Sequence, residues 1–265
     1  MNKGNNTIEK KISYSEFKTW KECPYKHNLS YVQGLSSFRG NLYSAFGTAI
    51  HEVCESILLK KKNNLELVFN NSFQREILLS EEKGVKIDPK LKAELTAQSA
   101  PIYSNLEETL NNKFGNYEVF SVEEPLYEKI EEFNAYDRSF KGFIDAVIKS
   151  EDGYYYIIDW KTCSWGWSSQ KKSDPIVNYQ LTFYKNFFCK KNKIDPKKVK
   201  TMFVLLKRTA KKEQIEFVEV TSGTKKVNNS LKLLEKAVIN IENNVKIKNR
   251  LSCKYCDFYK TENCK

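Results

Sequence analysis

Between residues 117 and 160 the periodicity of the sequence changes from helical to strand-like, and this change limits the fold more than any other feature. Strand-like runs lie at Tyr117 to Val122, Leu126 to Ile130, Phe140 to Ile148 and Tyr154 to Trp160. Short apolar or alternating runs of this kind predict β-strands. The last two runs are joined by residues 149–153, which end in a glycine and suit a hairpin turn. We therefore expect a strand meander in the middle of the chain.

Helical periodicity flanks these strands on both sides. Before them we expect a short helix capped by Ser13 or Ser15 and ended by Cys23-Pro24, and further helices over 44–62, 65–80 and 89–113. After them we expect a helix from Asp174 to about 191, strands at 200–206 and 215–220, and an amphipathic helix from 224 to about 248.

This succession predicts a single α/β domain with a mixed central sheet and helical additions at both ends. Within 1–265 we expect a flexible tail at 1–12, a helical part at 13–113, a core at 117–222 and a C-terminal helix with a cysteine cluster at 223–265.

Composition excludes several classes of protein. A chain of 265 residues that is 40% hydrophobic and 13% aromatic can bury a core and is not intrinsically disordered. It has no apolar run of membrane-spanning length and no secretory signal, so we expect a cytoplasmic protein of a bacterium or phage-infected cell. The net charge of +11 favours a polyanionic partner such as nucleic acid, and codon composition is the alternative explanation for the abundance of lysine.

Seven cysteines without a secretion signal indicate a reducing compartment rather than a disulfide framework. Three of them, Cys253, Cys256 and Cys264, lie in the last thirteen residues. Two cysteines separated by two residues can bind one metal centre. Because three ligands are one short of the usual four, a metal site here needs a further ligand from elsewhere in the chain.

Charged residues interrupt two of the apolar strands. Asp145 lies in one predicted strand, and Asp159 and Lys161 lie on one face of the next. A carboxylate in an apolar strand is costly unless it is paired or binds a metal. The three residues therefore predict a site for Mg²⁺ or Mn²⁺ with a lysine that stabilises charge on a phosphoryl group; the alternative is a structural ion pair.

Three other residues can join this site. Gln180 and Tyr184 lie four residues apart on one face of a predicted helix. His51, one of two histidines, lies on an earlier helix and could be a third metal ligand, although a lone helical histidine is more often structural.

These motifs, in this order, resemble the PD-(D/E)xK nuclease superfamily and, more narrowly, its RecB-like exonuclease branch. The resemblance spans about residues 13 to 265. The matching segments are Ser13-Tyr-Ser-Glu-Phe with Cys23-Pro24, Gly47-Thr-Ala-Ile-His51, Val122-Glu123-Glu-Pro-Leu, Gly142-Phe-Ile-Asp145, Ile158-Asp159-Trp-Lys161 and Gln180-Leu-Thr-Phe-Tyr184.

The resemblance implies a restriction-endonuclease-like fold and metal-assisted hydrolysis of phosphodiester bonds. Carried over, His51, Asp145, Asp159 and the carbonyl of Trp160 would bind the metal, and Lys161 would be the catalytic lysine. Gln180 and Tyr184 would hold that lysine and the DNA backbone. Glu123 is a further site residue, with Glu124 beside it as the competing choice.

The resemblance also supplies a fourth cysteine. Iron–sulfur members of this branch, such as AddB-type and CRISPR-associated adaptation exonucleases, bind a [4Fe–4S] cluster through one cysteine before the nuclease core and three after it. Cys23 with Cys253, Cys256 and Cys264 reproduces that arrangement and would join the two helical ends of the chain. A four-cysteine Zn²⁺ site and no metal at all are the alternatives.

A loop after the strand of Lys161 contains Trp165, Trp167, Lys171 and Lys172, a composition suited to binding single-stranded DNA. An equally good interpretation is that one of the two tryptophans packs into the core. The sequence as a whole predicts a Mg²⁺- or Mn²⁺-dependent exonuclease that acts on single-stranded DNA ends in recombination, repair, replication or CRISPR adaptation. Since it has no phosphate-binding loop, unwinding would need a helicase partner. The competing hypotheses are a non-catalytic DNA-binding module and a zinc-containing nucleic-acid-binding protein.

Overall fold

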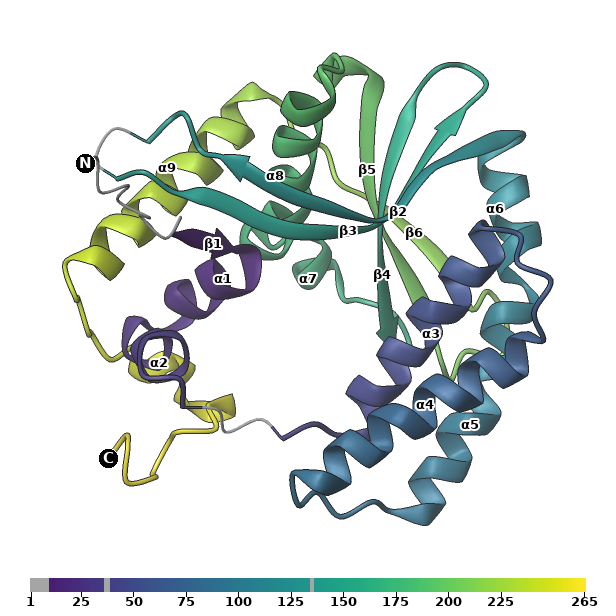
Figure 1. Cartoon of the computed structure of the whole chain (residues 1–265), viewed down its shortest axis with the longest axis horizontal. Coiled ribbons are helices and arrows are strands. Elements are labelled where there is room, and N and C mark those ends of the chain that lie inside the picture. The colour runs from purple at the N-terminus through teal and green to yellow at the C-terminus, as the bar shows by residue number, and fades with distance from the viewer. Residues whose placement is uncertain (1–9, 36–38, 134–135) are drawn as a thin grey trace, which may run out of the picture.

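The computed structural model describes residues 10–35, 39–133 and 136–265, and in these ranges six strands form one mixed sheet (Figure 1). The strands are β1 (Lys11–Ser13), β2 (Tyr117–Lys129), β3 (Ser139–Ser150), β4 (Tyr155–Cys163), β5 (Val199–Lys207) and β6 (Ile215–Glu219). Their order is β1-β3-β4-β5-β6, with β2 paired to β3. The β2–β3, β3–β4 and β5–β6 pairs are antiparallel, whereas β1–β3 and β4–β5 are parallel.

Helices cover both faces of the sheet. They are α1 (Tyr14–Glu22), α2 (Pro24–His27), α3 (Leu42–Leu58), α4 (Leu65–Glu82), α5 (Pro89–Ser104), α6 (Leu106–Phe114), α7 (Ser169–Ser173), α8 (Pro175–Asn192) and α9 (Thr224–Glu242). Shorter helical turns occupy Asn28–Val32, Pro196–Lys198 and Arg250–Tyr255. None of the helices in the described ranges is long and apolar enough to cross a membrane.

Two separate apolar cores lie on the two faces of the sheet. On one face, α1, α8 and α9 bury side chains such as Phe17, Phe183 and Leu234 against β3, β4 and β5. On the other face, α3 to α6 bury side chains such as Phe46 and Phe73. The strands are therefore covered on both sides, as expected for a three-layer α/β architecture. The mixed sheet flanked by helices confirms the predicted fold class.

Most predicted elements form close to their expected limits, with three differences. The first two predicted strands are one, β2, which passes through Pro125 because that proline lies on an edge strand and need not donate a ladder hydrogen bond. The predicted 89–113 helix is broken at Asn105 into α5 and α6. The last helix ends at Glu242, before Asn244 adopts a positive φ of 54°.

The prediction of a flexible tail over 1–12 does not hold for its last residues. Residues 1–9 lie outside the described ranges, but Lys11 and Ile12 belong to β1, and Ile12 is only 1% exposed. The apolar side chain of Ile12 belongs to the core on the α8 side, which explains why this segment is ordered as a strand.

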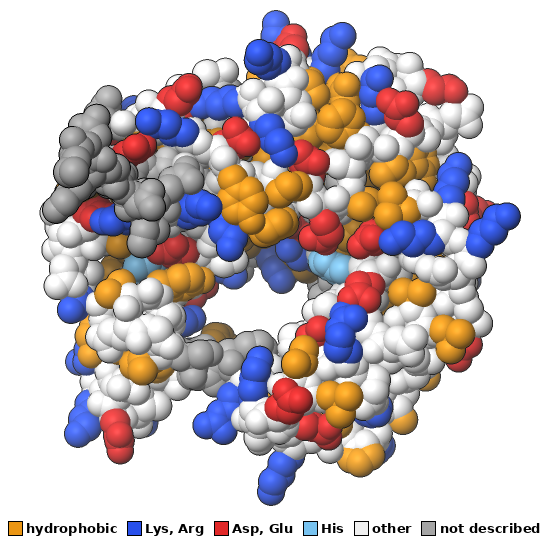
Figure 2. Space-filling view, viewed as in Figure 1, with side chains coloured by type: hydrophobic (Ala, Val, Ile, Leu, Met, Phe, Trp, Pro, Cys, Tyr) orange, Lys and Arg blue, Asp and Glu red, His pale blue; other side chains and the backbone are white. Residues whose placement is uncertain are grey.

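The two ends of the described chain lie together. Tyr25 donates its backbone N–H to the carbonyl of Ile247 at 3.1 Å, and the side chains of Asn249 and Ser252 both donate to the carbonyl of Glu22. The junction of these two ends and the helices α3 and α4 border an opening through the molecule, which is visible in Figure 2.

Candidate active site

The antiparallel strands β3 and β4 separate where the predicted carboxylates lie. Their paired residues run from Lys149↔Tyr155 to Ala146↔Ile158 and stop there, so Asp145 and Asp159 follow the last pair. Asp145 Oδ2 instead accepts a hydrogen bond of 2.7 Å from the backbone N–H of Trp160. The side chain of Asp145 therefore lies in the gap between the two strands.

Asp159 is the most buried acid of the site, with 1% of its surface exposed. Its Oδ1 accepts a hydrogen bond of 2.7 Å from Gln180 Nε2 on α8, and its Oδ2 forms an ion pair with Lys161. Gln180 Nε2 also lies 3.3 Å from the hydroxyl of Tyr184. The predicted lysine, acid and glutamine thus form one connected network.

Charge and burial alter the ionisation of this network. The pKa of Asp145 is raised well above its usual value by burial and then by the negative charge of Asp159. Burial alone would lower the pKa of Lys161, but the charges of Asp159 and Asp145 outweigh it and the pKa is raised. The site therefore holds a charged lysine beside two carboxyl groups that repel each other.

His51 reaches the same site from α3. Its Nδ1 lies 3.6 Å from Asp145 Oδ2. Burial lowers the pKa of His51, while the charge of Asp159 and the backbone of Trp160 act in the opposite direction. A neutral imidazole beside two carboxylates is a donor set that fits a divalent cation.

A glycine of β3 allows helix α8 to approach the strands, whereas the glycine of α3 is not required by the available space. A Cβ on Gly142 of β3 would lie 2.9 Å from Cε1 of Tyr184, so only glycine lets α8 place its tyrosine there. A Cβ on Gly47 of α3 would lie 3.4 Å from Oγ1 of Thr162, an ordinary contact.

The structure distinguishes Glu123 from Glu124. Glu123 has a positive φ of 47° at an irregular point of β2, and its pKa is raised by burial and by the charges of Glu55 and Asp159. Glu124 instead forms an ion pair of 2.6 Å with Lys191 on α8. Glu123 is therefore the glutamate that faces the carboxylates.

Sequence reasoning missed two neighbours of the site. Glu55 lies four residues after His51 on α3, and its charge acts on Glu123. That helical spacing was a readable signal. Tyr14 donates to the carbonyl of Ile176 at 3.2 Å, and its pKa is raised by burial and by the charge of Asp159. Nothing in the local sequence of Tyr14 indicates this placement, which depends on how α1 packs against α8.

The predicted DNA-binding loop divides into exposed and buried parts. Trp165 is 76% exposed, whereas Trp167 is 9% exposed and packs on Phe203 at 5.0 Å between ring centroids. The Trp167 ring is therefore covered by the core on the α8 side, as in the alternative that one of the two tryptophans belongs to the core. Lys171 lies over that ring at 4.3 Å, and Lys172 is paired with Glu216.

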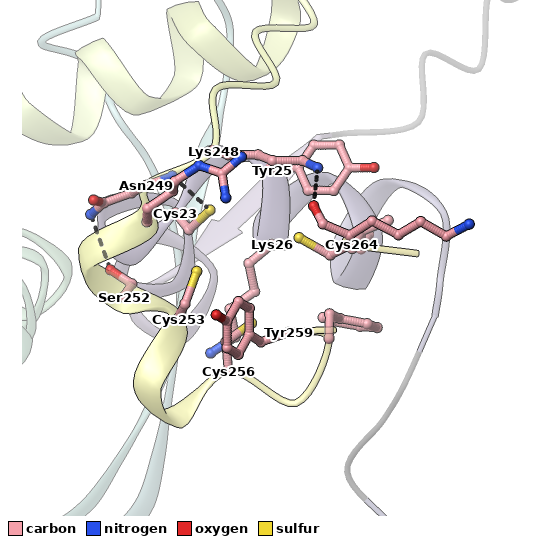
Figure 3. A pocket seen from close by; sticks show the side chains of 14 residues that line it. Cys23, Tyr25, Lys26, Lys248, Asn249, Ser252, Cys253, Cys256, Tyr259 and Cys264 are labelled. Atoms are coloured by element: carbon pink, nitrogen blue, oxygen red, sulfur yellow. Dashed lines mark hydrogen bonds between the residues drawn. The ribbon is translucent and has the colours of Figure 1, made fainter. Parts of the chain in front are cut away.

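The four cysteines of the predicted cluster line one pocket, named here the cysteine pocket, between α2 and the C-terminal turns. In Figure 3 the sulfurs of Cys23, Cys253 and Cys264 point into the space that these residues surround. All four thiols are free, and Cys23 Sγ accepts a hydrogen bond of 3.3 Å from the backbone N–H of Asn249. Thiols are ligands of zinc and of iron–sulfur clusters, so the chemistry of these four side chains fits a metal centre, and they line one pocket.

No group of three or more His, Cys, Asp or Glu side chains in the described ranges already has a metal-binding arrangement. This holds for the cysteine pocket and for the carboxylate site, where Lys161 and the Trp160 N–H contact carboxylate oxygens. The other three cysteines lie apart from the pocket. Cys54 and Cys189 are buried in the two cores, and Cys163 ends β4.

Comparison with known proteins agrees with this geometry. The family model described as the PD-(D/E)XK nuclease superfamily matches residues 11–261. A solved structure from Eubacterium rectale, provisionally named an exonuclease, superposes with a TM-score of 0.56 over 98% of this chain and 94% of that chain. Its 13% identity shows a shared fold alone.

A second solved structure, of the protein SSO0001, is 17% identical over 92% of this chain and 93% of that chain. Its TM-score of 0.38 is too low to support an argument. A search of curated proteins gave no match.

Proposed function

Because this chain belongs to the PD-(D/E)XK nuclease superfamily, we propose that it is a Mg²⁺- or Mn²⁺-dependent exonuclease of the RecB-like branch that hydrolyses DNA from single-stranded ends. One observation carries the proposal: four elements bring His51, Asp145, Asp159, Lys161 and Gln180 into one connected group. Carboxylates and an imidazole that can bind a divalent cation, beside a charged lysine, suit metal-assisted hydrolysis of a phosphodiester.

The metal ligands in this proposal are His51, Asp145, Asp159 and the carbonyl of Trp160. Glu123 is a further acidic residue of the site, whose charge acts on Asp145. Burial and the negative charge of Asp159 raise the pKa of Asp145, and a divalent cation held by these carboxylates would offset that repulsion. A divalent cation supplies Lewis acidity toward the phosphodiester and lowers the pKa of the attacking water.

The chain's own side chains orient the reaction. Lys161 carries a positive charge and stabilises the charge that develops on the phosphoryl oxygens. Gln180 donates a 2.7 Å hydrogen bond to Asp159. This bond fixes the position of the carboxylate that pairs with Lys161. Tyr184 keeps its proton because burial and the charge of Asp159 raise its pKa, and its hydroxyl is a hydrogen-bond donor for the DNA backbone.

Binding to DNA agrees with the shape and charge of the molecule. The opening in Figure 2 is bordered by α3, the helix of His51, and the net charge of +11 attracts a phosphate backbone. The pathway in this proposal is recombination, repair, replication or CRISPR adaptation, with unwinding by a separate helicase.

Cleavage assays on matched substrates test the proposal. We expect the wild-type protein to degrade linear single-stranded DNA in Mn²⁺ or Mg²⁺ and to leave circular single strands and end-blocked strands intact. Lys161→Ala should lower the rate by about 100- to 1,000-fold. Cleavage of the circular strand would identify an endonuclease, and wild-type protein without any cleavage would favour a DNA-binding module.

We also propose that Cys23, Cys253, Cys256 and Cys264 bind a [4Fe–4S] cluster. The support is their convergence on the cysteine pocket from the two chain ends. Anaerobically purified protein should contain iron and sulfide and absorb broadly in the visible range, and Cys253→Ala should lose both. Stoichiometric zinc without visible absorbance would instead identify a four-cysteine Zn²⁺ site.

A further inference from the structure

Two aromatic rings in contact lie exposed on strands β2 and β3. Tyr127 is 45% exposed and Phe143 is 41% exposed. Their ring centroids are 5.8 Å apart in an edge-to-face arrangement. Neither residue belongs to the two apolar cores of the described ranges. This aromatic pair therefore contributes little to the packing of the fold and leaves part of each ring open to solvent.

The aromatic pair lies on the same side of the sheet as helix α3. Phe140 of β3 stacks on Phe187 of α8 at 4.5 Å, and the Cα of Gly142 faces Tyr184 of α8. Because strand side chains alternate between faces, Phe143 points away from α8. Figure 2 shows hydrophobic side chains gathered on this face over β2 and β3, beside the central opening.

The aromatic pair is also next to the carboxylates. Phe143 precedes Asp145 by two residues on β3, a separation of about 7 Å along an extended strand. Alternation places both side chains on the same side, which agrees with the contact between Asp145 and His51 of α3. A single DNA strand that has a phosphate at Asp145 can therefore place the bases next to that phosphate over the rings of Tyr127 and Phe143.

Two lysines lie beside the Tyr127 ring. The ammonium of Lys11 lies 4.8 Å from the centroid of the Tyr127 ring. Lys141 is exposed, is the register partner of Tyr127, and forms no ion pair among the described residues. Exposed rings interleaved with lysines are the pattern of surfaces that bind single-stranded nucleic acid, in which bases stack and phosphates contact cations.

We propose that Tyr127 and Phe143 form a stacking site for the unpaired bases next to the scissile phosphate. The inference rests on the proposed nuclease function and deepens it, because it assigns the single-strand preference to two named rings. A duplex keeps its bases stacked on one another and offers no free base face to this pair. Lys141 is the neighbouring phosphate contact.

Equilibrium binding in EDTA tests this site without cleavage. The wild-type protein, Tyr127→Ala and Phe143→Ala are titrated onto a fluorescent oligothymidine and onto an abasic oligomer of the same length, with anisotropy as the readout. We expect each alanine variant to bind oligothymidine roughly 5- to 100-fold more weakly and to bind the abasic strand as the wild type does. Tyr127→Phe keeps the ring and should bind both strands normally.

Phe120→Ala is the matched control. Phe120 lies on β2 with 40% of its surface exposed, but its ring contacts Tyr155 and Phe188 on the α8 side of the sheet. Its replacement should leave oligothymidine binding unchanged. The proposal is overturned if the Tyr127 and Phe143 variants bind oligothymidine with wild-type affinity, or if their affinity for oligothymidine and for the abasic strand falls equally. It is also overturned if Phe120→Ala weakens oligothymidine binding as much as they do.

The binding result is separable from the proposed function. A wild-type protein that binds through these rings but never cleaves DNA would contradict the nuclease and leave the stacking site standing. A protein that cleaves DNA while both alanine variants bind normally would contradict the stacking site alone.

Discussion

At the scale of single residues, the carboxylates of Asp145 and Asp159 repel each other when no cation is bound. Asp145 and Asp159 follow the last paired residues of β3 and β4, and burial together with the charge of Asp159 raises the pKa of Asp145. An ionised Asp145 therefore destabilises the metal-free protein at neutral pH, because its proton affinity is higher in the folded than in the unfolded state.

Asp145→Asn should remove this cost. The amide oxygen can still accept the Trp160 N–H, so in EDTA at pH 7 we expect a Tm equal to that of the wild type or up to about 4 °C higher. Added Mn²⁺ should raise the Tm of the wild type and not that of the variant, because ligand binding stabilises only a competent site. Thermal melts with and without Mn²⁺ check this, and an equal increase in both proteins would exclude Asp145 as a ligand.

Two tryptophans of one loop should respond in opposite ways. Trp167→Ala removes a buried ring that packs on Phe203 and should lower the free energy of unfolding by about 3–5 kcal/mol. Trp165→Ala removes a ring that is 76% exposed and should change it by less than about 0.5 kcal/mol. Urea denaturation compares the two variants, and similar losses would show that Trp165 is also part of the packed structure.

At the scale of elements, local patterns predicted most of what forms. The Ser13 cap, the start of α8 after Asp174 and the β3–β4 hairpin follow from short-range chemistry, and all three are present. The sequence did not indicate that β2 continues through Pro125, because only the sheet shows that this strand lies at an edge. The burial of Trp167 and the position of Tyr14 beside the site could not be predicted for a similar reason. Both depend on elements that are distant in the sequence.

One ion-pair cluster joins three distant elements. Glu242 at the end of α9 pairs with Arg138, which immediately precedes β3, and with Lys10 at 2.8 Å, just before β1. Hydrogen bonding to Lys10, together with the charge of Arg138, lowers the pKa of Glu242. A carboxylate with a lowered pKa stabilises the fold above its ordinary pKa of about 4.3, and this contribution is lost as the pH falls through the lowered value.

Glu242→Gln should therefore destabilise the protein at pH 7 by about 1–2 kcal/mol, between the values for exposed and buried pairs. The difference from the wild type should shrink as the pH falls below about 4. Glu219→Gln is the control, because Glu219 forms a surface pair of 3.0 Å with Lys113 and is 61% exposed. Melting curves between pH 7 and pH 3.5 check this, and a difference that does not change with pH would contradict the ion-pair account.

At the scale of the whole molecule, the chain closes on itself. The contacts of Tyr25 with Ile247 and of Glu22 with Asn249 hold the two ends together without any metal. The cysteine pocket lies at this junction, so a bound cluster would close a loop that contains almost the whole chain. Constraining so long a loop in the unfolded state is worth about 5 kcal/mol in the chain-entropy model.

Loss of the proposed cluster should therefore weaken the junction and leave the nuclease core folded. We expect Cys256→Ala to lose its iron and to melt roughly 5–10 °C below the wild type, since part of the loop-closure free energy is kept by the hydrogen bonds at the junction. Cys163→Ala is the control, because Cys163 ends β4 far from the pocket in sequence and should keep its iron. Limited proteolysis should cut Cys256→Ala first near the C-terminal turns, where the 3₁₀ helix Arg250–Tyr255 leaves Leu251 95% exposed. A Cys256→Ala protein that retained wild-type iron and Tm would show that this cysteine closes no loop.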